Sequence, residues 1–93
     1  MPVEVSFYAT LRQIVGTKNV TFDLADGVTV RELLKVAGER YPGLDAVMWN
    51  PDGSLSDFVK VFIDGREIRH LDMLETRVPA LAQVDVFPPV AGG

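Results

Sequence analysis

The chain has 93 residues, and its 13 acidic and 9 basic side chains give a net charge of −4 when the single histidine is neutral. This length fits one small domain and is too short for two lobes that enclose a large cleft. The acidic balance argues against binding along nucleic-acid phosphates, because that binding needs clustered Lys and Arg. With 47 % hydrophobic and 24 % charged residues, the composition is that of a folded globular protein.

The chain contains no cysteine. This excludes disulfides, thiolate metal ligands and a cysteine nucleophile. The N-terminus lacks the basic and apolar regions of a signal peptide, and no window holds the 18 apolar residues of a membrane span. We therefore expect a soluble cytoplasmic protein.

Alternating apolar residues near the N-terminus predict a strand over residues 3–9, with its buried face formed by Val3, Val5, Phe7 and Ala9. A short helical or turn-like stretch over 10–15 leads to Gly16. A second strand over 20–24 follows, and the short connection favours an antiparallel hairpin.

The next segment begins with Thr29 and Glu32, which have the spacing of a helix capping box. Apolar residues then recur at helical spacing: Val30, Leu33, Leu34, Ala37 and Tyr41. Pro42 and Gly43 end this run. The helix has one apolar stripe, so we expect it to lie against a sheet.

Residues 44–57 show no regular pattern and predict a long loop, with a turn at 50–53 and with Trp49 and Leu55 as apolar contacts. Residues 70–81 are irregular in the same way.

Two further strands are predicted over 59–63 and 66–68, joined by a two-residue turn, and a last strand over 84–87 ends at two prolines. The helix can cross one face of the sheet, and the last strand can then return parallel to the first in the middle. The sequence therefore predicts an α+β fold of the β-grasp type, a mixed sheet packed on one main helix.

The chain lacks a recognisable catalytic constellation: it has neither a nucleophile-histidine-carboxylate arrangement nor a phosphate-binding glycine run. His70 is the only histidine and has Asp72 and Glu75 nearby. Metal sites usually need three or four ligands, so we predict a solvated or capping side chain and no metal site.

The C-terminal residues 88–93 are predicted to be a tail beyond a domain of residues 1–87. Pro88 and Pro89 favour an extended backbone, whereas Gly92 and Gly93 have no side chain. A thin end that carries a carboxylate suits a substrate threaded into another protein's active site. Transfer of a nucleotidyl group from ATP would activate the Gly93 carboxylate as an acyl adenylate, which a sulfur nucleophile then attacks.

The segment 87–93 resembles the C-terminal signature of the ubiquitin-like sulfur carriers (MoaD/ThiS), above all the MoaD-type small subunit of molybdopterin synthase. The resemblance extends to residues 3–12, 29–34 and 61–65, and to the Tyr-Pro pair after the main helix. The long loop and the segment 69–72 resemble a subgroup that serves cysteine synthesis, tRNA thiolation or protein conjugation.

This resemblance implies a β-grasp fold and adenylation of Gly93 by an activating enzyme of the ubiquitin-activating type. The enzyme uses ATP, and the carrier itself binds no cofactor. A sulfur donor then converts the end into a thiocarboxylate, which gives up its sulfur in biosynthesis, with the molybdopterin synthase large subunit as one partner. Two alternatives stay open: a modifier joined through Gly93 to target lysines, and a plain β-grasp interaction domain.

Besides Gly93, the candidate tail and partner-binding residues are Phe62, Phe87, Pro88, Pro89, Val90, Ala91 and Gly92. Strand alternation places Phe62 and Phe87 opposite the valine-rich faces of their strands. We expect core packing for these aromatics; exposed beside the tail, they would instead form an apolar docking patch. The chain departs from the family before the last strand, where the family often has an acidic Gly-Asp or Gly-Glu turn and this chain has Leu81, Ala82 and Gln83.

Overall fold

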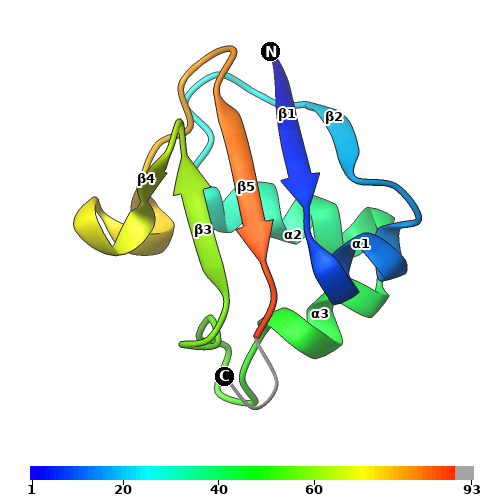
Figure 1. Ribbon diagram of the computed structural model, residues 1–93. Helices are drawn as coiled ribbons and strands as arrows, with labels where there is room; N and C mark the ends of the chain where they lie inside the picture. Colours follow the sequence, from blue (N-terminus) through cyan, green and yellow to red (C-terminus); the bar gives the residue numbers. More distant parts are fainter. Residues whose placement is uncertain (90–93) are drawn as a thin grey trace.

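The computed structural model describes residues 1–89 and shows a mixed sheet with helices packed on one of its faces (Figure 1). The strands are β1 (Pro2–Phe7), β2 (Asn19–Asp23), β3 (Lys60–Ile63), β4 (Arg66–Glu67) and β5 (Gln83–Phe87). The helices are α1 (Ala9–Val15), α2 (Val30–Arg40) and α3 (Gly43–Met48), with 3₁₀ turns η1 (Ile68–His70) and η2 (Met73–Glu75).

The strand order is β2-β1-β5-β3-β4. β1 and β5 are parallel, whereas the β1–β2, β3–β5 and β3–β4 pairs are antiparallel. The last strand therefore lies beside the first in the middle of the sheet, which confirms the predicted α+β fold of the β-grasp type.

The first strand ends earlier than the sequence predicted. β1 stops at Phe7, and Tyr8 precedes α1, with its carbonyl accepting from the Leu11 and Arg12 amides at 3.0 and 3.4 Å. Ala9 begins α1, is exposed and has a φ of 50°. Its place in the alternation was coincidental, because the backbone turns away from the sheet after Phe7.

The capping box of α2 is present. The Thr29 hydroxyl accepts from the Glu32 amide at 3.3 Å, and the Glu32 carboxylate accepts from the Thr29 amide at 3.5 Å. The apolar stripe of α2 is buried, and Figure 1 shows the helix crossing behind the sheet. The predicted position of the main helix is thus confirmed.

The prediction of an irregular loop over 44–57 was wrong in its first part, which forms α3. Leu44 and Met48 lie one turn apart on this helix and are both buried. Six residues are too few for the helical period to stand out in the sequence. The predicted turn is present, with the Gly53 amide donating to the Asn50 carbonyl at 2.9 Å.

The segment from 66 to 81 also differs from the prediction. β4 ends at Glu67 because Ile68 begins the 3₁₀ turn η1, and a second 3₁₀ turn, η2, lies in the stretch predicted to be irregular. Ile68 and Leu74 are buried, so both turns close one end of the core.

The core lies between the sheet and the helices. Its largest fully buried side chains come from the inward positions of the central strands, from α1 to α3, and from Val59 before β3: Val3, Val5, Phe7, Leu11, Val30, Leu33, Leu34, Leu44, Met48, Val59, Val61 and Val84. None of the helices within residues 1–89 is long and apolar enough to cross a membrane. The side chains at the outward positions of the strands lie on the opposite face of the sheet from the helices, and we call this the open face.

Candidate functional site

The open face is built from alternate residues of the strands. Cross-strand pairing sets one row across the whole sheet: Glu67, Phe62, Asp85, Ser6 and Asn19. Next to it, toward the end of β5, Lys60 pairs with Phe87. Tyr8, just after β1, lies against Phe87 on the same face.

Tyr8, Phe62 and Phe87 form an aromatic cluster on the open face. The Tyr8 and Phe87 rings stack with centroids 4.2 Å apart and planes 13° apart. Phe62 meets Phe87 edge-on, with centroids 5.6 Å apart. All three side chains are half-buried, so the expectation that these phenylalanines pack in the core was wrong. The neighbouring valines on β3 and β5 already fill the face that the helices cover.

A hydrogen-bond network fixes the cluster from one side. The Tyr8 hydroxyl donates to Asp85 Oδ1 at 2.8 Å, and the side-chain amide of Gln83 (Nε2) donates to the same oxygen at 3.2 Å. Gln83 also donates to Ser6 Oγ at 2.8 Å, and Ser6 donates to Asn19 at 2.6 Å. The bond to Asp85, followed by desolvation, raises the pKa of Tyr8 above its usual value of 10.0.

Basic side chains border the cluster at the end of the sheet where β5 stops. The Lys18 ammonium lies 5.0 Å from the centroid of the Tyr8 ring. On the other edge, Glu67 Oε2 lies 4.0 Å from Lys60 Nζ and 3.4 Å from Arg69 Nε. This end of the open face therefore combines an apolar centre with cations on both sides.

The predicted tail begins beside this cluster. β5 ends at Phe87, and the two residues that follow it are packed against the domain: Pro88 is buried and Pro89 is half-buried. The structure thus brings together Phe62, Phe87, Pro88 and Pro89. The other predicted site residues, Val90, Ala91, Gly92 and Gly93, lie outside the described residues, and their roles stay predictions.

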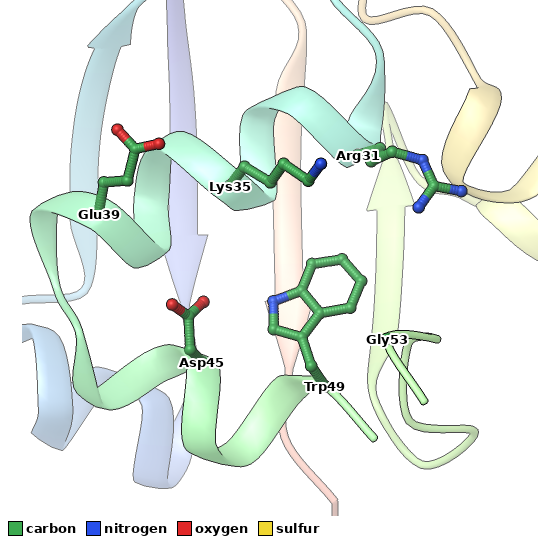
Figure 2. A pocket seen from close by; sticks show the side chains of 6 residues that line it. All are labelled: Arg31, Lys35, Glu39, Asp45, Trp49 and Gly53. Atoms are coloured by element: carbon green, nitrogen blue, oxygen red, sulfur yellow. The ribbon is translucent and has the colours of Figure 1, made fainter. Parts of the chain in front are cut away.

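A groove of about 540 Å³ lies on the helical side of the molecule (Figure 2). It runs between α2 and α3 and is lined by Arg31, Lys35, Glu39, Asp45, Trp49 and Gly53. The helices meet closely beside it, since a Cβ added to Gly38 would lie 2.1 Å from Asp45 Oδ1. The sequence did not reveal this groove, and none of the predicted site residues lines it.

A second hollow, of about 340 Å³, lies on the open face and is lined by Pro2, Glu4, Thr21, Leu81, Ala82 and Gln83. Within residues 1–89, no three His, Cys, Asp or Glu side chains are grouped closely enough to hold a metal ion. His70 is exposed at the end of η1. The open face, which holds the predicted aromatics and the start of the tail, is therefore the candidate site.

Comparison with known proteins agrees with this geometry. Residues 5–93 match the ThiS family. The chain is 39 % identical over 93 residues to small archaeal modifier protein 3 of Haloferax volcanii, with both chains fully covered. It is 35 % identical over 93 residues to the molybdopterin synthase sulfur carrier subunit of Chlamydomonas reinhardtii, again with full coverage of both.

Solved structures show the same fold. The crystal structure of SAMP1 from Haloferax volcanii superposes with a TM-score of 0.89 at 27 % identity, with both chains fully covered. In the BexX/CysO complex of Amycolatopsis orientalis, the matching chain gives a TM-score of 0.79 at 30 % identity, covering 98 % of this chain and 99 % of that one. The chain therefore belongs to the ThiS family of ubiquitin-like sulfur carrier and modifier proteins.

Proposed function

We propose that this protein is a sulfur carrier whose Gly93 carboxylate is the reacting group. The observation that carries the proposal is the aromatic cluster of Tyr8, Phe62 and Phe87, which lies on the open face at the point where the predicted tail begins. An apolar patch with a polar border is typical of a protein docking site. A partner that binds this patch is well placed to receive the C-terminus.

The chemistry needs activation, because a free carboxylate is a poor electrophile. A Gly93 oxygen attacks the α-phosphorus of ATP, and pyrophosphate leaves. A sulfur nucleophile then attacks the carbonyl carbon of the acyl adenylate, and AMP leaves as the C–S bond forms. The ATP site and the sulfur donor belong to partner proteins, the first of them an activating enzyme of the ubiquitin-activating type. We place this ATP-dependent reaction in the cytoplasm.

The role of this chain is to present the tail. Stacking of Tyr8 on Phe87 holds the last residue of β5, and the two prolines that follow limit the backbone angles at the exit. On this proposal the fold acts as a handle from which the C-terminus is presented to a partner. Glycines at the tip allow a narrow channel in the partner to accept it.

The acceptor of the sulfur is proposed from the relatives. Similarity to the Chlamydomonas subunit supports the small subunit of molybdopterin synthase, whose large subunit would then be a partner. A carrier for cysteine synthesis or tRNA thiolation uses the same tail chemistry. Similarity to small archaeal modifier protein 3 favours a second candidate function, conjugation of Gly93 to target lysines through the same adenylate.

Activation can be tested with the purified chain and the ubiquitin-activating-type enzyme of its own host. We expect ATP–pyrophosphate exchange that depends on the chain and disappears when Gly93 is deleted. Gly92→Trp should also block exchange, because a bulky side chain widens the tip, while both variants keep the thermal stability of the wild type. Wild-type rates of ATP–pyrophosphate exchange with the Gly93 deletion variant would contradict the proposed function.

A further inference from the structure

Leu81 is a leucine in a backbone conformation that favours other residue types, and its side chain is not part of the core. It lies at the third place of the turn 79–82, which is closed by the Ala82 amide donating to the Pro79 carbonyl at 3.2 Å. Its φ is 62°, in the left-handed region that turns of this kind usually fill with glycine or asparagine. A leucine in this conformation is strained, yet Leu81 is 83 % exposed.

The hollow beside Leu81 belongs to the open face. Glu4 pairs with Gln83 on β5 and with Thr21 on β2, so the three side chains form one row of that face. Pro2, Leu81 and Ala82 complete the lining with apolar surface. The row next to it contains Ser6 and Asp85, which are hydrogen-bonded to Gln83. The hollow is thus continuous with the surface that holds the aromatic cluster.

Glu4 supplies the charge of this hollow. Glu4 is exposed and has no ion-pair partner within residues 1–89. Asp64 accepts from the Gln83 backbone amide at 2.9 Å, and Asp23, across from Pro2, is paired with the Met1 ammonium at 3.0 Å. The opposite end of the open face carries Lys18 and Lys60 instead. The two ends of the open face therefore differ: Glu4 gives the Leu81 end a negative charge, whereas the tail end carries the two lysines.

We propose that Leu81 and Glu4 form a second anchor of the docking surface, which receives an Arg or Lys side chain of the activating enzyme. The aliphatic stem lies along Leu81, and the cationic head meets the Glu4 carboxylate. This inference rests on the proposed function and adds the site that selects the partner. The strain at Leu81 is then retained because its exposed side chain binds another protein.

The dimensions allow one partner to reach both anchors. Six residue steps separate Leu81 from Phe87, which is at most about 20 Å of extended chain. A standard protein interface buries about 800 Å² on each side, a patch about 30 Å across. The described part of the molecule measures 36 × 28 × 24 Å, so such a patch would cover most of the open face.

The test measures kcat and KM of ATP–pyrophosphate exchange by the host activating enzyme with the full chain and its variants. Leu81→Asn and Glu4→Gln should each raise KM about tenfold, the effect of a binding contact worth about 1.4 kcal/mol, and leave kcat unchanged. Asparagine tolerates the left-handed backbone, so Leu81→Asn should keep or raise the melting temperature. Val36→Asn, a change at a 38 % exposed valine on α2, is the matched control and should leave KM unchanged.

Salt adds a second readout. Rising ionic strength should increase KM for the wild type more than for Glu4→Gln, because the variant has lost the charge that salt screens. If both variants keep the wild-type KM while the wild type is activated, the inference falls and the proposed function stands. A lower melting temperature of Leu81→Asn would assign Leu81 to the fold and equally overturn the inference. If the wild type is not activated at all, the proposed function fails first and takes the inference with it.

Discussion

The Tyr8 and Phe87 rings stack almost in parallel, with centroids 4.2 Å apart, on the face of the sheet that the helices leave open. Tyr8 directly follows β1, and Phe87 is the last residue of β5. The stack therefore joins the ends of the two central parallel strands at the point where the tail begins. It links the stability of the sheet to the start of the predicted tail.

Phe87→Ala should lower both the stability of the sheet and the affinity of the activating enzyme for this chain. The variant loses the stack with Tyr8 and the edge contact with Phe62, so we expect the free energy of unfolding to fall by about 2 kcal/mol and KM for activation to rise. Urea denaturation and pyrophosphate exchange measure the two effects. Phe58→Ala is the control for stability, because Phe58 is 71 % exposed and its loss should change unfolding by less than about 0.5 kcal/mol. Wild-type stability of Phe87→Ala would exclude the stack as a structural element.

Tyr8→Phe should separate the hydrogen bond from the ring stacking. The hydrogen bond to Asp85 raises the pKa of Tyr8. The stabilisation by this hydrogen bond is therefore complete below pH 10 and is lost as the pH rises through the folded-state pKa of Tyr8. We expect the variant to be about 1 kcal/mol less stable at pH 7 and to approach the wild type in strong base. Denaturation curves between neutral and alkaline pH give both values. A stability difference that stays constant with pH would refute this role of the hydroxyl.

Thr29→Ala should destabilise α2 from its N-terminus. The change removes the hydroxyl that accepts from the Glu32 amide, and loss of such a cap lowers stability by about 1 kcal/mol. Thermal unfolding measures it, with Thr17→Ala at an exposed position between α1 and β2 as the control. Activation kinetics should be unchanged in Thr29→Ala, since α2 lies on the other side of the sheet from the docking surface. Equal melting temperatures of the two variants would be evidence against the capping box.

The regular elements of this fold were predictable because their signals are local. Strand alternation identified the longer strands, the two-residue turn at Asp64 and Gly65 indicated β4, and the Thr29 and Glu32 pair located the start of α2. The helix α3 escaped prediction because six residues hold too few apolar positions to show a helical period. The end of β1 was misplaced for a related reason, since alternation continued by chance through Ala9 after the backbone had left the sheet.

The candidate site was predictable only in part. Alternation placed Phe62 and Phe87 on the outer side of their strands, but it carries no information on whether another layer covers that side. Only the topology shows that α1 to α3 all pack on the opposite face. The hollow at Leu81 joins residues from β1, β2 and the turn before β5, so it becomes visible once the strands are in register.

The most direct test of the central claim is the intact mass of this protein purified from its native host under conditions in which sulfur is transferred. The sulfur-carrier function predicts a fraction of the chain whose mass corresponds to replacement of one oxygen by one sulfur, and deletion of Gly93 should abolish that species. A series of larger masses from Gly93-linked adducts, without the sulfur-containing form, would show a modifier instead. Detection of the unmodified carboxylate alone would contradict the proposed function.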